Sequence, residues 1–297
     1  MGPTSSIAGN VTGAEYPLRL CPLSRSSVRR MDELRGRVGV ITGGASGIGL
    51  ATAERLAAEG MNLVLADIEQ ATLEAAAEQV AAAGVDVEPV VTDVTDLDAV
   101  NALADATWER FGGCHFLFNN AGVAVGGPIA EMSHADWKWC IDVDLWGPIH
   151  GVEAFLPRMI DQREGGHITS TASFAGVVPN DGLGVYCVAK YGVVAMSEVL
   201  WRELRQHEIG VSVLCPMRLA TNIDASGRNR QNDYGGPESQ AYPEVDEEEM
   251  AGDMLGPDVA ADLVLKGIRE NQLYLFTHPE SRDFIRRRFE RMDRAFD

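Results

Sequence analysis

Three side chains in the second half of the chain have the types and the spacing that proton transfer requires. Tyr186 and Lys190 stand four residues apart, which on a helix places both side chains on one face. A tyrosine with its ordinary pKa of about 10 exchanges protons poorly near neutrality, but a neighbouring ammonium group favours the phenolate. Such pairs also occur by chance on helix surfaces. Ser173, thirteen residues before Tyr186, adds a hydroxyl that can hold a reacting oxygen, so the three residues predict acid–base chemistry on an alcohol or a carbonyl.

A glycine-rich segment nearer the N-terminus suits the binding of a pyrophosphate. Residues 42–49 read Thr-Gly-Gly-Ala-Ser-Gly-Ile-Gly and lie where an expected strand ends and an expected helix begins. Glycines permit a tight turn and a close backbone approach, and the free N–H groups of a helix start attract negative charge. Glycine-rich turns also serve packing, but the strand–turn–helix context favours a dinucleotide site. The segment lacks the Lys-Ser/Thr pair of a nucleoside-triphosphate loop.

An acidic residue indicates which dinucleotide would bind. Asp67 ends the second expected strand, eighteen residues after Gly49. An acid at this place accepts hydrogen bonds from the adenosine ribose hydroxyls and repels a 2′-phosphate. No Arg or Lys lies between Thr42 and Leu50, or directly after Asp67, to bind such a phosphate. The sequence therefore predicts NAD rather than NADP as the cofactor; the alternative is a solvated aspartate at a strand end.

The elements that must position these residues alternate regularly from Arg37 onward. Short apolar strands are expected at 38–42, 62–66, 85–91, 115–119, 167–171, 211–214 and 273–276. Helices are expected at 50–59, 70–83, 96–111, 135–162, 185–208 and 258–270. Such alternation is typical of right-handed βαβ units. We therefore predict an α/β fold with a single doubly wound, Rossmann-type parallel sheet and helices on both of its faces.

The chain divides into one central domain and two flanking segments. Residues 1–33 are rich in Gly, Ser, Thr and Pro and predict a disordered extension ahead of an alternative start at Met31; a transit peptide is the competing interpretation. Residues 34–280 are the expected Rossmann-fold domain. Within it, residues 218–256 are polar and acidic without clear periodicity, which predicts a substrate loop or lid.

Residues 281–297 predict a basic amphipathic helix at the C-terminus. Ile285, Phe289, Met292 and Phe296 follow one another in a 4-3-4 spacing, opposite six arginines. Such a helix could contact an anionic membrane surface, the acidic body of the protein or another subunit.

Composition argues against several classes of protein. Apolar residues make up 45% of the chain and charged residues 23%, so the chain can bury a core. The net charge of −19 disfavours a nucleic-acid partner. No stretch approaches the ~20 apolar residues of a membrane-spanning helix, so we expect no integral membrane segment. Five scattered cysteines without a C-x-x-C pair argue against a disulfide framework and against a metal site, and they favour a cytoplasmic protein.

Taken together, these motifs resemble those of the short-chain dehydrogenase/reductase family. The matching features are the glycine-rich segment, Asp93, the run from Asn119 to Gly122, Ser173 and Tyr186-x-x-x-Lys190, in the family's order and spacing. The likeness covers about residues 34–276. It implies an NAD(P)-dependent oxidoreductase with a small-molecule alcohol or ketone substrate, and a homodimer or homotetramer.

The resemblance also implies a role for each matching residue. Tyr186 would be the acid/base, Ser173 would stabilise the substrate oxygen, and Lys190 would bind the nicotinamide ribose and lower the tyrosine pKa. Asp93 would lie by the adenine, and Thr221 by the carboxamide. The candidate catalytic residues are thus Ser173, Tyr186, Lys190 and Asp144. The candidate cofactor-binding residues are Gly43, Ser46, Gly47, Ile48, Gly49, Asp67, Asp93, Val94, Asn120, Ala121, Gly122, Tyr186, Lys190 and Thr221.

Three positions depart from the family's pattern. Asp144 stands where relatives have an asparagine whose helix kink holds a relay water, so a negative charge enters the expected proton relay. Ser170 replaces the asparagine usual three residues before the serine. Met217 replaces the glycine that usually follows the proline, which should narrow the substrate pocket and make it more apolar.

The sequence favours an NAD-dependent oxidoreductase that interconverts a secondary alcohol and a ketone. The apolar residues Val178, Leu183, Met217 and Leu219 suggest a hydrophobic or alicyclic substrate. The alternative, motivated by Asp144, is a dinucleotide-sensing binding module of the same fold with weakened catalysis. An epimerase or dehydratase acting on nucleotide sugars is a third interpretation, although such enzymes usually have a longer substrate domain.

Overall fold

The structure is a computed structural model that describes residues 31–237 and 252–297. Most of the expected N-terminal extension, and residues 238–251 of the expected loop, lie outside the described residues. Leu34, where the folded domain is expected to begin, is buried.

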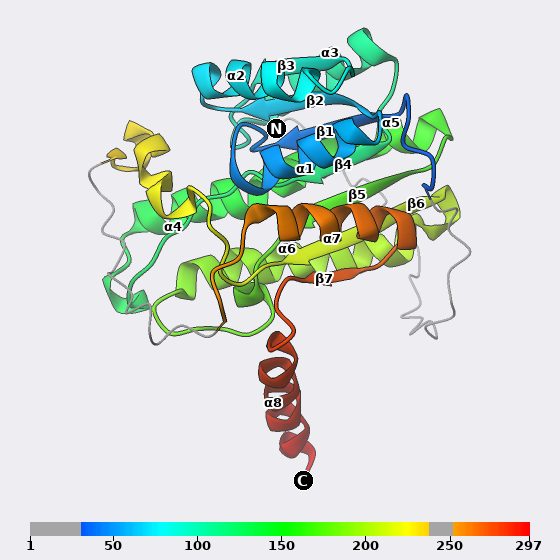
Figure 1. Cartoon of the computed structure of the whole chain (residues 1–297). Helices are drawn as coiled ribbons and strands as arrows, with labels where there is room; N and C mark the ends of the chain where they lie inside the picture. The colour runs from blue at the N-terminus through cyan, green and yellow to red at the C-terminus, as the bar shows by residue number, and fades with distance from the viewer. Residues whose placement is uncertain (1–30, 238–251) are drawn as a thin grey trace, which may run out of the picture.

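Seven parallel strands form one sheet at the centre of the molecule (Figure 1). In chain order they are β1 (Val38–Thr42), β2 (Asn62–Asp67), β3 (Val87–Val91), β4 (Phe116–Asn119), β5 (Gly166–Thr171), β6 (Ile209–Cys215) and β7 (Tyr274–Phe276). Their order across the sheet is β3-β2-β1-β4-β5-β6-β7, and every neighbouring pair is parallel. From β1 the chain adds β2 and β3 on one side of the sheet and then returns to add β4 on the other side, so the direction of strand addition reverses between β1 and β4. In sheets of this kind ligands bind beyond the carboxyl ends of the strands at that reversal.

Helices cover both faces of the sheet, so the predicted doubly wound α/β fold is confirmed. The first face is covered by α1 (Gly47–Ala58), α2 (Gln70–Ala81) and α7 (Pro257–Glu270). The second face is covered by α3 (Leu97–Phe111), α5 (Gly147–Gln162) and α6 (Gly184–Glu203).

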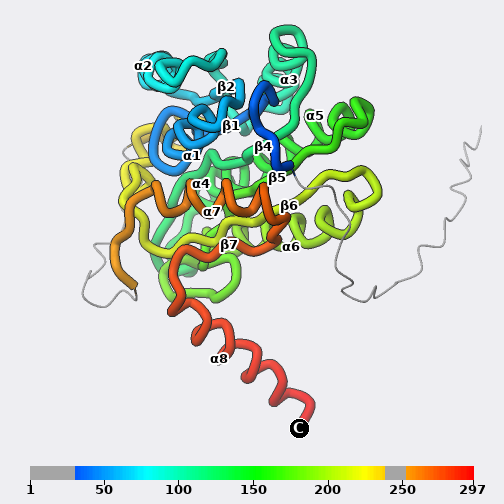
Figure 2. The backbone as a smooth tube through the Cα atoms, turned by 45° about the vertical axis from the view of Figure 1, so that its right-hand side comes forward, coloured from blue at the N-terminus to red at the C-terminus, as the bar shows by residue number. Residues whose placement is uncertain are grey.

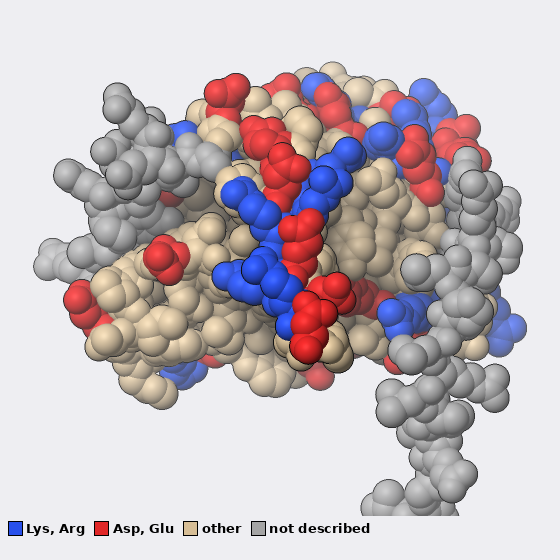
Figure 3. All heavy atoms as spheres, turned by 90° about the horizontal axis from the view of Figure 1, so that it is seen from below, with Lys and Arg blue, Asp and Glu red and all other residues tan. Residues whose placement is uncertain are grey.

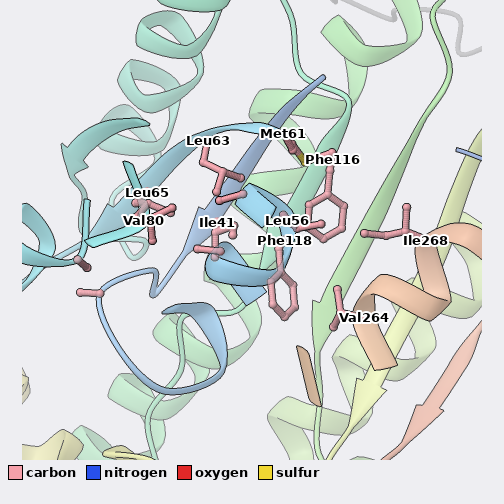
Figure 4. Packing of buried hydrophobic residues seen from close by; sticks show 14 of the residues in the cluster. Ile41, Leu56, Met61, Leu63, Leu65, Val80, Phe116, Phe118, Val264 and Ile268 are labelled. Carbon is pink, nitrogen blue, oxygen red and sulfur yellow. The ribbon is translucent and has the colours of Figure 1, made fainter. Parts of the chain in front are cut away.

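The core consists of strand side chains that alternate between these two helical layers. Ile41, Phe116 and Phe118 pack with α1 and α7 (Figure 4). Val40 and Leu117 pack on the other face, with α3 and α5. All five side chains are fully buried. Strands buried on both faces are continuous apolar runs, which is why the sequence pattern located them well.

The helix expected over residues 135–162 is interrupted in the middle. It comprises α4 (His134–Ile141), a π-helical turn (Asp142–Trp146) and α5. Ser133 caps α4 with a capping box closed by Asp136, and Pro148 stands in the first turn of α5. A π-helical turn inside a helix frequently marks a functional site. Here it places the fully buried Asp144 at the carboxyl edge of the sheet, which apolar periodicity cannot predict.

Several expected boundaries are shifted, including the starts of β3 and β6 and the end of α2, and two further ones are wrong for local reasons. The helix expected to run to residue 208 ends at Glu203, because a 3₁₀ turn (Leu204–His207) and Glu208, with φ +57°, tighten and stop it. The helix expected to begin after Gly49 begins at Gly47, so two residues of the glycine segment belong to its first turn.

The C-terminal segment is helical, as predicted, and projects from the body. Helix α8 (Ser281–Asp293), with a further 3₁₀ turn (Arg294–Phe296), points away from the sheet in two views related by a 45° rotation (Figures 1 and 2). No helix among the described residues combines the length and apolar character needed to cross a bilayer.

Candidate active site

The glycine-rich segment forms the turn between β1 and α1 at the carboxyl edge of the sheet. Gly43 has φ +65° and Gly47 has φ +53°, conformations that side chains other than glycine rarely adopt. A Cβ atom on Gly49 would lie only 2.0 Å from the carbonyl oxygen of Gly43. These glycines keep the turn tight and leave the N-terminus of α1 open, with Ser46 at the N-cap and Ile48 in the first turn. The geometry fits a dinucleotide pyrophosphate.

The carboxylate of Asp67 lies beside this turn at the end of β2. It accepts hydrogen bonds from the backbone N–H of Ala45 (3.2 Å) and of Glu69 (3.1 Å). Burial raises the pKa of this carboxyl, and the two backbone donors act in the opposite direction. Asp67 thus has a fixed orientation at the carboxyl end of β2.

A chain of hydrogen bonds joins the glycine turn to α6. The amide of Asn120 donates to the carbonyl oxygens of Thr42 (3.1 Å) and Gly43 (3.2 Å). The Asn120 carbonyl oxygen accepts from the hydroxyl of Thr171 (3.0 Å), and the backbone carbonyl of Thr171 accepts from Lys190 Nζ (3.2 Å). Ala121 N–H donates to the Thr42 hydroxyl (3.1 Å). The dinucleotide turn and the candidate catalytic lysine are therefore held in one network.

Lys190 and Asp144 form a fully buried ion pair. Lys190 Nζ lies 3.7 Å from Asp144 Oδ1, with side chains 2% and 0% exposed. Asp144 Oδ1 also accepts from the backbone N–H of Val123 at 2.8 Å, and Cys140 Sγ lies 3.8 Å from the other carboxylate oxygen. Complete burial raises the pKa of the Asp144 carboxyl, whereas Lys190 and the Val123 N–H act against this rise. A Cβ on Gly122 would crowd both charged groups, at 3.1 Å from Asp144 Oδ1 and 3.4 Å from Lys190 Nζ.

The candidate catalytic residues converge above the carboxyl ends of β5 and β6. Lys190 Nζ lies 5.4 Å from the centroid of the Tyr186 ring, within the range of a cation–π contact. Tyr186 is 9% exposed, and Ser173, at the N-cap of the 3₁₀ turn that follows β5 (Phe174–Gly176), is half-buried. The Ser173 hydroxyl accepts a hydrogen bond from the backbone N–H of Ala175 (3.1 Å). Cys187 is buried among apolar residues.

Part of the expected lid, residues 219–236, lies across the adenosine side of the edge; we call it the strap. Glu69, two residues after Asp67, accepts hydrogen bonds from the side chains of Arg228 and Asn229, the latter at 2.6 Å. Asp93 accepts from Gln231 at 2.8 Å, and its other oxygen accepts from Thr95. The hydrogen bonds from Asn229 and Arg228 hold the pKa of Glu69 below its usual range.

The strap is also fastened along the rest of the site. The fully buried Arg230 pairs with Asp136 of α4 at 2.6 Å. The Tyr234 hydroxyl donates to Asp142 at 2.9 Å, and the Ser226 hydroxyl accepts from the backbone N–H of Ala124 at 3.1 Å. At the N-terminal end of the strap, the Thr221 side chain lies 3.3 Å from the position that a Cβ atom on Gly47 would occupy. Val94 is buried in the same apolar cluster as Tyr234.

Every candidate residue of the sequence therefore lies along one edge of the sheet. The sequence did not indicate Thr171, Glu69 or Arg228. Thr171 acts through its backbone carbonyl, which no motif marks, and Arg228 reaches Glu69 across 159 positions. No basic residue follows Asp67 directly in the sequence, but in the fold Arg228 binds Glu69, two residues after Asp67. Among residues 31–237 and 252–297 no group of three or more His, Cys, Asp or Glu is arranged to hold a metal ion.

Comparison with known proteins gives this site a family. The family model described as "short chain dehydrogenase" matches residues 37–232, from the start of β1 into the strap. The chain belongs to the short-chain dehydrogenase/reductase family. As a member of that family it is an oxidoreductase of the alcohol-dehydrogenase type that uses a nicotinamide dinucleotide.

Similar proteins cover nearly all of this dehydrogenase/reductase. A CLA biosynthesis dehydrogenase/reductase from Lactiplantibacillus plantarum is 30% identical over 273 aligned residues, which cover 88% of this chain and 95% of the relative. A 1-deoxy-11-beta-hydroxypentalenate dehydrogenase from Streptomyces avermitilis is 34% identical over 250 residues, covering 84% and 87%. The crystal structure of a short-chain dehydrogenase/reductase from Burkholderia phymatum in complex with NAD has a TM-score of 0.81 and 38% identity, covering 89% of this chain and 97% of that one.

Proposed function

We propose that this protein is an NAD-dependent oxidoreductase that interconverts a secondary alcohol and a ketone, with Tyr186 as the acid/base. One observation carries the proposal: the buried ammonium group of Lys190 lies 5.4 Å from the centre of the Tyr186 ring. A cation at this distance favours the phenolate, so proton exchange with a substrate oxygen becomes feasible near neutrality.

Each residue at the edge has a definite part in this reaction. A bound nicotinamide dinucleotide supplies the hydride acceptor or donor. Tyr186 takes the proton of the alcohol, or returns one to the ketone oxygen, and the Ser173 hydroxyl holds that oxygen in place. Lys190 stabilises the phenolate and is itself held by the Thr171 carbonyl and by Asp144.

NAD is the proposed cofactor because of the charges around the adenosine ribose. The carboxylates of Asp67 and Glu69 lie at and just beyond the carboxyl end of β2, where we expect them to repel a 2′-phosphate, and Arg228 is already paired with Glu69. The solved structure of the Burkholderia phymatum relative contains NAD.

We expect Asp67→Ala to lower the ratio of kcat/KM for NAD to that for NADP by at least about tenfold, because the repulsion of the 2′-phosphate and the ribose hydrogen bonds are lost together. A ratio within twofold of the wild type, from initial rates with both cofactors, would contradict the cofactor assignment.

The substrate we propose is hydrophobic or alicyclic. Val178, Leu183, Met217 and Leu219 are only partly buried along the edge next to the catalytic residues. The name of the Streptomyces avermitilis relative refers to an alicyclic hydroxy compound, a hydroxypentalenate.

We also propose a cytoplasmic enzyme, since the four cysteines within the described residues are free and buried, as suits a reducing compartment.

A second candidate function, a dinucleotide-sensing module without efficient turnover, is favoured only by the unusual acid at position 144. The test that separates the two is a panel of alicyclic and other secondary alcohols with NAD, and of the matching ketones with NADH, followed by absorbance of the reduced cofactor. We expect turnover of at least one alicyclic alcohol. Tight NADH binding without turnover across the whole panel would favour the sensing module instead.

A further inference from the structure

Helix α8 and the 3₁₀ turn that continues it (Arg294–Phe296) carry an apolar stripe that nothing within the described chain covers. Phe289, Met292 and Phe296 are 53%, 51% and 90% exposed. The contacts that fasten α8 to the body lie in its first turns: Phe284 meets the edge of Phe174 at 5.9 Å between ring centres, and the Arg288 guanidinium lies 5.4 Å from the Tyr191 ring. The helix projects from the body (Figures 1 and 2).

A helix in this situation needs a partner. Isolated helices shorter than about 12–15 residues are marginal in water, and most helical stability in proteins comes from packing of the apolar face. The exposed part of α8 is shorter than that. Large exposed aromatic side chains in one row are typical of an interaction surface.

The spacing of the stripe identifies the kind of partner. Ile285, Phe289, Met292 and Phe296 alternate by four and three residues, which is the seam of a two-helix coiled coil rather than the broader face of a helix packed on a globular core. When two copies of this helix lie antiparallel, Ile285 faces Phe296 of the second copy and Phe289 faces Met292. The stripe is complementary to itself, as a two-fold interface requires.

The charges that flank the seam fit the same arrangement. Arg286 and Asp293 border it on the same side, so antiparallel pairing places each arginine beside the aspartate of the other helix. Seen from the side on which α8 projects, basic and acidic side chains alternate in a central band (Figure 3).

A lipid surface is a poorer fit than a second copy. Residues 281–297 contain six arginines but also four acidic residues, so the segment has a charge of only +2. The remainder of the chain has a charge of −21, which an anionic membrane would repel.

We propose that α8 pairs antiparallel with α8 of a second copy of this chain through the seam Ile285–Phe289–Met292–Phe296. The helix begins beside Phe174 and Tyr191, which directly follow the candidate catalytic residues Ser173 and Lys190 in the chain. The paired helices would therefore also hold this side of the site in place.

The proposal is tested by measuring the oligomeric state of the full-length protein. The double substitution Phe289→Glu with Phe296→Glu should halve the number of copies per particle, measured by sedimentation equilibrium over a range of concentrations. The dissociation constant of the pairing step should rise by at least about 100-fold, because both aromatic anchors are lost from each copy. Arg294→Glu, on the opposite face of the same helix, is the matched control and should leave the number unchanged. Retained circular dichroism and NADH binding would show that the variants are folded.

Charge reversal tests the direction of pairing. Arg286→Asp alone and Asp293→Arg alone should each weaken the assembly, and the two substitutions together should restore it. A monomeric wild type, or an unchanged copy number in the Phe289/Phe296 double variant, would overturn the proposal. Binding of the wild type to phosphatidylserine vesicles that this double substitution abolishes without changing the copy number would also overturn it, in favour of a membrane surface.

Discussion

At the scale of single residues, we expect the buried pair of Asp144 and Lys190 to set the acidity of Tyr186. A neutral asparagine at position 144 would leave the lysine's charge fully effective on the phenol. The carboxylate 3.7 Å from Lys190 Nζ offsets part of that charge, so the phenolate is less stabilised. The Thr171 carbonyl and the Val123 N–H hold the two partners in place.

We therefore expect Asp144→Asn to shift the rise of kcat/KM for alcohol oxidation to lower pH by about one unit, which is the effect of 1.36 kcal/mol on the phenol. The measurement is the pH profile of initial rates with NAD. Asp105→Asn, on the exposed surface pair with Arg158, serves as the control and should leave the profile in place. An unchanged profile in the Asp144 variant would show that the carboxyl does not act on the phenol.

The sequence identified these residues because each is fixed by its chemical type at a motif position. Tyr186, Lys190 and Ser173 need particular functional groups, and Gly43 and Gly47 need positive φ. It could not reveal the ion pair, because the approach of Asp144 to Lys190 depends on the π-helical turn between α4 and α5. It also missed Thr171, since any residue type can supply a backbone carbonyl.

At the scale of elements, the strap is the feature most able to control exchange of the dinucleotide. It crosses from Gly47 to Glu69 and Asp93 and is tied to α4 through Arg230 and Asp136. We expect the contact between Glu69 and the strap to slow the entry and exit of the dinucleotide. The depressed pKa of Glu69 means that this contact is fully formed at neutral pH and is lost only as the pH falls below the ordinary range of a glutamate.

Arg228→Ala should loosen the strap and speed NADH dissociation by about two- to fivefold, the effect of an exposed ion pair. Stopped-flow displacement of NADH by excess NAD gives this rate. Arg158→Ala removes a comparable exposed pair far from the strap, with Asp105, and provides the comparison. Equal dissociation rates in both variants and the wild type would mean that the strap does not limit exchange.

The elements of the sheet were predictable and the strap was not. Strands such as β1 and β4 are apolar runs between turn residues. The helices that connect the strands end at glycines, as α3 does at Gly112, or at short turns, as α6 does. The strap has short 3₁₀ turns (Ile223–Asn229 and Asn232–Tyr234), which have no apolar period. Its position comes from side-chain hydrogen bonds to residues more than ninety positions away, such as Arg230 with Asp136.

At the scale of the whole molecule, cofactor binding should stabilise the fold as one unit. Residues from β1, β2, β4, β5 and α6 all line the site, so the dinucleotide binds only the native arrangement. At a free NAD concentration one hundred times its dissociation constant, the free energy of unfolding should rise by about 2.7 kcal/mol. For a domain of this size that is a rise in Tm of about 5–10 °C by thermal denaturation. NADP should raise Tm less at the same concentration, and an equal rise with both cofactors would contradict the proposed preference.

The central claim is that Tyr186 moves the proton while the rest of the site holds the dinucleotide. Tyr186→Phe removes only the phenolic oxygen, so the ring, Lys190 and the glycine turn remain. The most direct measurement combines turnover of an accepted alcohol with NADH binding by fluorescence titration in this one variant. The account predicts a loss of kcat by at least about 100-fold with NADH affinity within a few-fold of the wild type. Turnover close to that of the wild type would contradict it.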